Sequence, residues 1–453
     1  MTKSQVSRCS TYSVEFRKAK LARAGQEKPY PLTSFANRVF KGVFPGPVRW
    51  VDRAGPREPR FCQGKAVLVQ WAGLSQKAGK NVSFGGDILL GLYFHVPFCH
   101  GKCPYCDFYS LPDSQSQMDE YAAAVLAALA PWGEKLRGRE VSTVYFGGGT
   151  PSLLGAERLR SILQGVREGF ALSPTAEVTL EANPTQVDRA FFQEAREAGF
   201  NRLSMGLQSA NPEELRLLGR AHSPEQAAKA VADARAAGFE NISLDLMLGL
   251  PGGSREKLSR SINFAASLGV EHISSYLLKV EPGTPFARRG VEVPDEDEAA
   301  EQYLFAVEAL GKRGYGQYEI SNFAKPGRES RHNLLYWRCE EYLGLGPGAH
   351  SFLEGRRFFY PRDLAGFLAG KPPAEDGPGG DFGEFAMLNL RLTRGLCRED
   401  CLSRFGEQGG ALFDQLREKA RGLPPQLLRV EKGRVAFTPE GFLVSNALLL
   451  ALE

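Results

Sequence analysis

Long hydrophobic runs are missing from this sequence of 453 residues. No apolar stretch reaches the roughly 18 residues that a membrane-spanning helix needs, and no charged segment leads into an apolar one near Met1. We therefore expect neither membrane insertion nor secretion, and we place the protein in the cytoplasm. Tryptophan is scarce, with four residues against 29 phenylalanines and 50 glycines. This composition argues against a collagen, a coiled coil or a disordered chain, and it is typical of an α/β enzyme with a sizeable core.

Acidic residues are scarce in one part of the chain only. Residues 1–86 hold 16 lysines and arginines but four acids, a net charge of +12 within an overall +4, so the remaining residues carry −8. The basic excess is confined to one arm. The main body therefore gives no indication of nucleic-acid binding.

This arm, residues 1–86, also lacks a helical or strand periodicity and is interrupted by turn pairs such as Pro45-Gly46. We expect it to be largely disordered. Two origins fit its composition: an organelle transit peptide, or upstream DNA translated from a wrongly chosen start. We favour the second, because an ordered pattern begins abruptly near Leu90.

From Leu90 onward, short apolar runs alternate with helical stretches. Two of the helical stretches open with a cap residue followed by proline, in Asn211-Pro212 and Ser223-Pro224. Six apolar runs are predicted strands: residues 92–98, 143–146, 178–182, 202–207, 242–248 and 272–277.

An internal repeat supports the same organisation. The segment AREAGF at residues 195–200 precedes one predicted strand, and ARAAGF follows 39 residues later, before the next. In each copy a glycine stands where the helix should end. Repeated helix–strand units give parallel strands with right-handed crossovers. We therefore predict an α/β domain over residues 87–290, either a β/α barrel or an open doubly wound sheet, between which periodicity does not choose.

The pattern changes beyond residue 290. We predict a barrel extension over residues 291–370, with a helix at 295–313 and an irregular stretch at 321–351, then a Gly/Pro-rich linker at 370–380. Residues 371–453 form a predicted C-terminal domain, helical over 383–422 and followed by a hairpin of 427–430 and 434–437. Helices followed by a hairpin suggest a winged-helix-like module, but this stretch shows no concentrated basic face.

Three of the eight cysteines, Cys99, Cys103 and Cys106, fall within eight residues on the loop after the first predicted strand. One tight cluster among scattered cysteines indicates a metal site rather than disulfides. Zinc would need a fourth ligand, for which His95 and His100 are candidates. Three thiolates fit an iron–sulfur cluster with one open iron better. The glycine and proline of this loop argue against buried, reduced core cysteines.

The segment from Tyr93 to Phe108 resembles the signature of radical S-adenosylmethionine (radical SAM) proteins, in the branch that contains oxygen-independent coproporphyrinogen III oxidase and the HemW family of heme chaperones. The resemblance extends to the C-terminus. It implies a partial (β/α)6 radical SAM barrel and a 4Fe-4S cluster on Cys99, Cys103 and Cys106, whose open iron binds SAM. The oxidase carries a further cysteine at the position of Phe108, and this departure favours the chaperone family.

Other features agree with a SAM pocket. A glycine-rich loop at residues 147–151 follows the second predicted strand, where glycine lets backbone groups approach a ligand. Polar residues also stand near the ends of later strands, on the rim that binds ligands in β/α barrels. The resemblance assigns SAM contacts to Tyr93, Tyr105, Gly148, Gly149, Thr150, Glu181, Gln208, Arg220 and Asp245. Some of them could serve a second SAM, and Arg220 could instead be a solvated arginine at a helix end.

The segment His332-Asn333-Leu334-Leu335-Tyr336-Trp337 resembles the HNxxYW motif of the heme-chaperone family. Histidine can ligate heme iron, and aromatic rings can stack on a porphyrin. A structural histidine that caps a turn is the competing interpretation. The resemblance favours His332 as a heme-binding residue.

These observations predict a heme chaperone with a 4Fe-4S cluster and SAM, which passes heme to a membrane-associated or respiratory acceptor. Oxygen-independent coproporphyrinogen III oxidation and a non-catalytic zinc-binding protein are the alternatives. The sequence leaves open whether SAM is cleaved, so it does not decide whether the protein is an enzyme. It also leaves open a homodimer.

Overall fold

The structure is a computed structural model that describes residues 90–112 and 114–453. The prediction of a disordered arm over residues 1–86 lies outside these residues. A large sheet has 12 strands in the order β14-β13-β12-β11-β1-β4-β5-β6-β7-β8-β10-β9. Its centre consists of six consecutive parallel strands: β1 (Leu90–Val96), β4 (Glu140–Gly148), β5 (Ala171–Ala182), β6 (Arg202–Gln208), β7 (Ile242–Leu248) and β8 (His272–Leu277).

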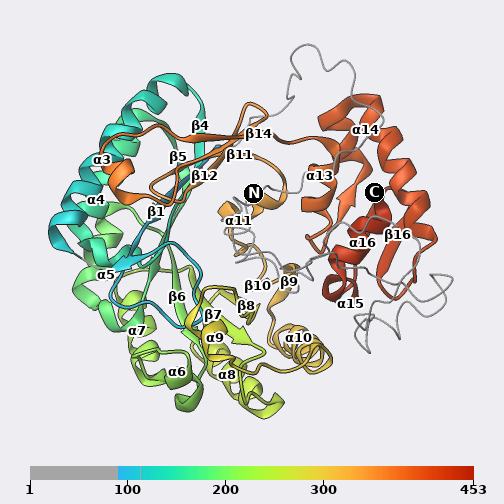
Figure 1. Ribbon diagram of the computed structural model, residues 1–453, viewed down its shortest axis with the longest axis horizontal. Coiled ribbons are helices and arrows are strands. Elements are labelled where there is room, and N and C mark those ends of the chain that lie inside the picture. The colour runs from blue at the N-terminus through green and yellow to red at the C-terminus, as the bar shows by residue number, and fades with distance from the viewer. Residues whose placement is uncertain (1–89, 113) are drawn as a thin grey trace, which may run out of the picture.

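All six predicted strands are confirmed, and so is the partial barrel. The two edge strands, β14 (Ala374–Pro378) and β9 (Gly316–Glu319), do not pair with each other, so the curved sheet stays open. The helices between the parallel strands lie along the outer face of the sheet (Figure 1). They are α3 (Gln115–Lys135), α4 (Gly155–Gly169), α5 (Arg189–Ala198), α6 (Pro212–Leu217), α7 (Pro224–Ala236) and α8 (Arg255–Ser267).

Local signals explain where these helices begin and end. Ser223 and Gln226 form a reciprocal capping box at the start of α7, with Pro224 in the first turn. At the end of α5, Gly199 adopts a left-handed conformation with φ of 108°, which glycine takes without a steric penalty. The repeat noted in the sequence therefore marks helix ends.

The parallel strands alternate in polarity. In β6, Leu203, Met205 and Leu207 belong to the hydrophobic core, which continues under the outer helices. Arg202 and Ser204, which alternate with these residues in sequence, instead line a cavity on the inner side. A side-chain period of two residues thus places a polar set inside the barrel and an apolar set against the helices.

The extension over residues 291–370 is more regular than predicted. The helix is confirmed as α10 (Glu296–Gly311), but the irregular stretch at 321–351 is wrong: β11 (Glu341–Leu345) pairs in parallel with β1. Other short elements here are α9 (Pro285–Arg289), β10 (Asn322–Ala324), α11 (Arg331–Trp337), β12 (His350–Leu353), β13 (Arg356–Phe359) and α12 (Leu364–Leu368). The predicted linker contains β14, which pairs with β13. Segments of three to seven residues are too short to show a period, and sheet pairing defines them.

The C-terminal helices and hairpin are present as predicted. The elements are α13 (Phe382–Asn389), β15 (Leu396–Cys397), α14 (Arg398–Arg421), β16 (Leu428–Glu431), β17 (Arg434–Phe437), α15 (Pro439–Leu443) and α16 (Ser445–Leu452). The strands form a separate sheet in the order β15-β17-β16. The domain boundaries remain a prediction, and since β14 belongs to the large sheet, we propose that the C-terminal unit begins after it.

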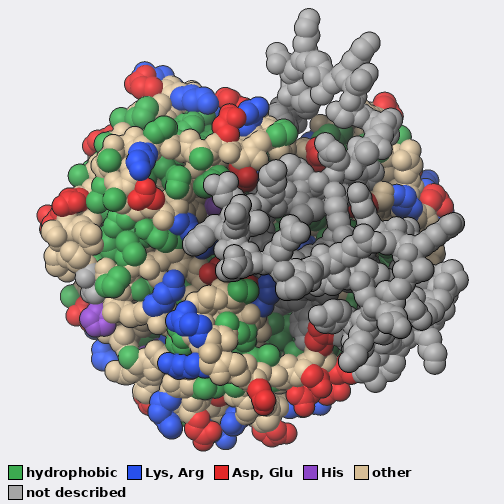
Figure 2. Space-filling view, viewed as in Figure 1, with side chains coloured by type: hydrophobic (Ala, Val, Ile, Leu, Met, Phe, Trp, Pro, Cys, Tyr) green, Lys and Arg blue, Asp and Glu red, His purple; other side chains and the backbone are tan. Residues whose placement is uncertain are grey.

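Acidic and basic side chains are mixed on the face shown in Figure 2, with apolar ones between them. Among the described helices, none is both long and apolar enough to cross a bilayer.

Candidate functional site

The cysteine loop leaves the carboxyl end of β1. It continues through β2 (Phe98–Cys99) and returns at β3 (Leu111–Pro112), which pairs with β2 in parallel. Cys99, Cys103 and Cys106 are half-buried thiols that form no disulfide with one another, and all three line one cleft of about 390 Å³. The loop therefore presents the three predicted cluster ligands to a common space.

The thiols suit a cluster rather than a single ion. Within residues 90–112 and 114–453, no three His, Cys, Asp or Glu side chains are grouped to hold one metal ion. The thiolates of a cubane each bind a different iron, so they need not converge on one point. The half-exposed thiols in one cleft fit a 4Fe-4S cluster in this respect.

The glycine-rich loop after β4 lies directly against the cysteine loop. The Gly149 N–H donates to the Val96 carbonyl and the Thr150 N–H to the Phe98 carbonyl, each at 2.7 Å. A Cβ at Gly149 would overlap that Phe98 carbonyl oxygen, and Gly148 has a φ of 111°. The Thr150 hydroxyl lies 3.6 Å from the Cys99 sulfur. Glycine is required here because two backbones approach closely at the edge of the cleft.

The structure separates the nine predicted SAM contacts into two levels. Glu181 and Tyr93 are placed deeper, in an inner cavity of about 60 Å³. Gly148 and Asp245 line both spaces, so the two are adjacent. The cleft at the cysteine loop is lined by Tyr105, Gly148, Gly149, Thr150, Gln208, Arg220 and Asp245.

Arg220 is not a solvated helix-end residue. Its Nε and Nη2 donate to the Tyr105 hydroxyl at 3.0 and 2.6 Å, and the side chain is only half exposed. Burial raises the pKa of Tyr105 well above its usual range, so the hydroxyl keeps its proton. The pair closes the side of the cleft next to Cys103 and Cys106.

Gln208 and Asp245 reach the cleft for different reasons. Gln208 has a φ of 66°, rare for a residue other than glycine, and the β6–β7 register shifts between Gly206 and Gln208. Such an irregularity re-aims a side chain at the end of a strand. Asp245 faces inward on β7 and accepts a hydrogen bond of 3.4 Å from Ser204.

The interior of the barrel is polar. Apolar runs in the sequence predict the strands but not this polar interior. Every second residue of the parallel strands points inward, and the alternation of polar with apolar residues in the sequence was the available signal. The residues that line the inner cavity are Tyr93, Phe108, Tyr145, Gly148, Glu181, Arg202, Ser204, Asp245, His272, Ser274, Tyr276, His332, Asn333 and Tyr336.

The HNxxYW segment forms α11, which lies on the inner side of the sheet (Figure 1). Ser330 caps the helix, so His332 is not the capping residue. His332 is 1% exposed: its Nδ1 is hydrogen-bonded to the Thr143 hydroxyl (2.7 Å) and its Nε2 to the Tyr336 hydroxyl (2.8 Å). Burial lowers the pKa of His332 to about 3, so the imidazole is neutral.

The two aromatic residues of the motif have different surroundings. Tyr336 lines the inner cavity and packs edge-to-face on His332, with ring centroids 5.0 Å apart. Trp337 is fully buried in the hydrophobic core. The expectation that both rings stack on a porphyrin is therefore wrong for Trp337, because adjacent helical residues point in different directions.

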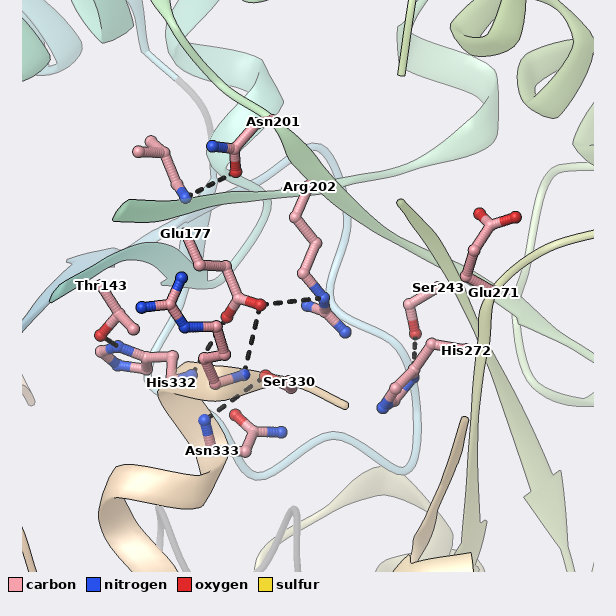
Figure 3. Close-up of polar contacts among 12 residues, drawn as sticks. Thr143, Glu177, Asn201, Arg202, Ser243, Glu271, His272, Ser330, His332 and Asn333 are labelled. Atoms are coloured by element: carbon pink, nitrogen blue, oxygen red, sulfur yellow. Dashed lines mark hydrogen bonds and ion pairs between the residues drawn. The ribbon is translucent and has the colours of Figure 1, made fainter. Parts of the chain in front are cut away.

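A buried carboxylate holds α11 in place (Figure 3). Glu177 on β5 accepts hydrogen bonds from the backbone N–H groups of Arg331 (3.2 Å) and His332 (3.1 Å). A carboxylate at the first turn of a helix satisfies donors that have no partner within the helix. Arg202 lies 3.9 Å from the same carboxylate. Glu177 and Arg202 did not figure in the sequence-based site.

Comparison with known proteins gives consistent matches. The sequence profile of the radical SAM superfamily matches residues 93–265. The heme chaperone HemW of Mycobacterium tuberculosis (strain ATCC 25618 / H37Rv) is 40% identical over 378 residues, covering 80% of this chain and 94% of that protein. HemW of Escherichia coli (strain K12) is 41% identical over 342 residues, with coverages of 73% and 89%.

A solved structure shares the fold. The coproporphyrinogen III oxidase HemN from Escherichia coli, a radical SAM enzyme, aligns with a TM-score of 0.68 over 81% of this chain and 90% of its own. The sequence identity is 23%. At that level the likeness supports a common fold.

Proposed function

Because this chain belongs to the HemW family of heme chaperones within the radical SAM superfamily, we propose that it binds heme and passes it to acceptor proteins. The superfamily brings two cofactors, a 4Fe-4S cluster and SAM. We assign the cluster to Cys99, Cys103 and Cys106, which share one cleft. When bound, the cluster supplies the electron that cleaves SAM in this superfamily.

The protein's own residues have distinct roles in this proposal. The backbone of Gly148 and Gly149 and the hydroxyl of Thr150 form the wall against which SAM lies. Arg220, held by Tyr105, adds a positive charge at the opposite side of the cleft. Glu181 and Asp245 offer carboxylate oxygens to hydroxyl or amino groups of the ligand, below the cleft. Gln208, the last residue of β6, contributes its side chain to the lining of the cleft.

The position of α11 is the observation that supports heme binding most directly. His332 and Tyr336 line the same cavity as the assigned SAM residues Glu181 and Asp245. Both imidazole nitrogens of His332 are hydrogen-bonded and the cavity beside the ring measures about 60 Å³, so heme ligation through Nε2 requires the Tyr336 hydroxyl to leave and the cavity to widen. The imidazole is neutral and needs no deprotonation to bind iron.

Delivery to a membrane-associated or respiratory acceptor, a cytoplasmic location and a homodimer belong to the same proposal. HemW relatives are named as heme chaperones. A chaperone must release its cargo. The hydrogen bonds of His332 to Thr143 and Tyr336 compete with iron for the imidazole, and this competition favours reversible heme binding.

Oxygen-independent coproporphyrinogen III oxidation is the second candidate, because the oxidase HemN shares the fold. The side chain at the position of the oxidase's additional cysteine is Phe108, which lines both the cleft and the inner cavity. An aromatic side chain there supplies apolar surface in place of a thiol. This observation favours the chaperone.

Anaerobic reconstitution followed by two parallel assays tests the proposal. We expect the reconstituted protein to retain heme through gel filtration and to transfer it to an apo-acceptor. With SAM and a reductant, we expect it to leave coproporphyrinogen III unchanged. Efficient decarboxylation of coproporphyrinogen III without heme retention would favour the oxidase function over the heme-chaperone function.

A further inference from the structure

The floor of the barrel interior holds a buried arginine, one of whose donors makes no hydrogen bond within the described residues. Arg202 lies at the start of β6 and is 2% exposed. Its Nε has no hydrogen-bond partner among the described residues. The Glu177 carboxylate is 3.9 Å away, beyond hydrogen-bond distance, and already accepts two backbone N–H groups of α11. A buried guanidinium in this state has donors to offer to a ligand.

A second buried polar atom without a hydrogen-bond partner among the described residues lies on the neighbouring strand. Thr179 on β5 is directly paired with Arg202 in the sheet register. It is 0% exposed, and its hydroxyl makes no hydrogen bond within the described part of the chain. Val178 and Leu180 on either side belong to the hydrophobic core, so Thr179 points to the inner face like Arg202. Two adjacent unsatisfied donors on neighbouring strands are unusual in a folded interior.

Arg202 is the only lysine or arginine among the described residues that line the inner cavity. Arg202 lines the inner cavity, and Figure 3 shows its side chain between the imidazoles of His332 and His272. Burial keeps both imidazoles neutral, and the Arg202 charge lowers both pKa values further. The nearest acid, Glu177, forms an ion pair with Arg202 at 3.9 Å and also accepts the two N–H groups of α11, and the carboxylates of Glu181 and Asp245 line the same cavity. The cavity adjoins the cleft at Gly148 and Asp245, which line both.

We propose that Arg202 and Thr179 form a subsite for a carboxylate group of a ligand bound above them. A carboxylate has two oxygens that can accept from a guanidinium and a hydroxyl at once. The cavity of about 60 Å³ admits such a group but not a whole porphyrin or nucleoside. Heme carries two propionates, and a second SAM would carry a carboxylate that the open iron of the cluster does not hold, so either can supply the group. The heme source rests on the proposed function, whereas the SAM source does not.

Two pairs of ligands, whose members differ only in the carboxylate, show whether heme or SAM supplies the carboxylate. Heme is compared with heme dimethyl ester, and SAM with decarboxylated SAM, on the reconstituted full-length protein. Thr179→Val removes the hydroxyl at nearly constant volume. Ser275→Ala is the matched control, because Ser275 is also a fully buried, unpartnered hydroxyl but lies on the opposite face of β8, next to inward-facing Ser274.

For each pair we measure the ratio of the two affinities, that of the ligand with the carboxylate over that of the ligand without it. We expect Thr179→Val to lower this ratio about tenfold for one of the pairs, as for loss of a hydrogen bond to a charged group. Arg202→Gln should lower it further, and Ser275→Ala should leave it unchanged. Thr179→Val should not reduce thermal stability, because it removes a buried polar group without a partner. The Thr179→Val variant therefore tests the carboxylate subsite even if Arg202→Gln fails to fold.

A loss confined to the heme pair identifies a propionate site, and a loss confined to the SAM pair identifies a SAM carboxylate site. Equal preferences in the wild type and Thr179→Val for both pairs would overturn the subsite. If the wild type does not bind heme at all, the heme-chaperone proposal fails, and the SAM pair still tests Arg202 and Thr179.

Discussion

The reactive side chains of this protein have two different environments. The three thiols of the cysteine loop are half exposed at the mouth of the cleft, where ligands can reach them. His332 and Arg202 lie almost fully buried at the floor of the barrel. Substitutions at the two levels should therefore have separable effects.

Replacing Cys99, Cys103 or Cys106 with alanine should abolish the visible absorbance of the cluster and SAM binding, because each thiolate holds a different iron. The measurements are the absorption spectrum and the iron content after anaerobic reconstitution. Alanine at Cys339 or Cys401 should leave both unchanged, since these thiols do not line the cleft. A triple variant of the loop that still carried a full complement of iron would contradict the assignment.

His332→Ala should weaken heme retention while the cluster spectrum stays intact. The imidazole belongs to α11 and the inner cavity, not to the cysteine loop. Heme retained through gel filtration and the cluster spectrum are measured on the same sample. His222→Ala serves as control, because His222 is a buried histidine whose Nε2 is bonded to the Leu207 carbonyl and which does not line the inner cavity. Equal heme retention in all these proteins would argue against His332 as a heme residue.

The buried imidazole of His332 should also make the fold acid-sensitive. Its pKa is lowered to about 3 in the folded state, against about 6.5 when unfolded. Below pH 6.5 the unfolded chain takes up a proton that the native chain does not, so stability falls as pH falls toward 3. The expected loss from this residue is about 2 kcal/mol between pH 7 and pH 5. Urea unfolding of the wild type and His332→Asn at both pH values measures it, and an equal loss in both proteins would contradict it.

The short helix α11 shows how one element depends on a distant strand. Seven residues are too few for a stable isolated helix. The helix is held because Glu177 accepts its first N–H groups and Thr143 binds the His332 ring. Residues of the barrel strands therefore fix the position of α11 over the inner cavity.

Glu177→Gln should loosen this attachment. The substitution removes the only carboxylate that faces Arg202 in the described ion pairs, and leaves a buried cation uncompensated. Loss of one member of a buried pair costs about 3 to 5 kcal/mol. We expect a lower urea midpoint and faster amide exchange of residues 331–337. Glu197→Gln is the control, because its ion pair with Arg160 is largely exposed and should contribute at most about 1 kcal/mol.

The whole molecule is connected at the sheet edge next to the C-terminal unit. Glu319, the last residue of β9, forms an isolated bridge with Leu392, and the Ile320 N–H donates to the Arg391 carbonyl. The Glu319 side chain is fully buried and accepts hydrogen bonds from the Ser321 N–H and the Asn322 side chain. Burial raises its pKa to about 8.

This carboxyl should make the protein less stable as the pH rises from about 4.5 to about 8. In that range the folded chain keeps a proton that the unfolded chain has lost, so the free energy of unfolding falls by up to about 1.4 kcal/mol per pH unit. Glu319→Gln should remove this decline and raise the melting temperature at pH 8. Parallel melting curves at pH 6 and pH 8 measure the effect, and an unchanged pH slope in the variant would contradict it.

Local patterns were sufficient for much of the fold and for the upper part of the site. The six strands, the capped helices and the C-terminal hairpin follow from periodicity and from cap residues, which act within a few positions of the chain. The three cysteines share a loop for the same reason. The resemblance to a known family then supplied most of the remaining residues of the cleft.

The floor of the barrel required the tertiary structure. Glu177, Arg202 and His332 meet across more than 150 residues of sequence, through the register of β5 and β6 and the docking of α11. No local pattern encodes such a meeting. The strand β11 was missed for the same reason, because its pairing with β1 depends on a partner some 250 residues away. His332 has hydrogen-bond partners, whereas Arg202 Nε has none within the described part of the chain. Which of the two states a polar residue has depends on neighbours that only folding brings within hydrogen-bond distance.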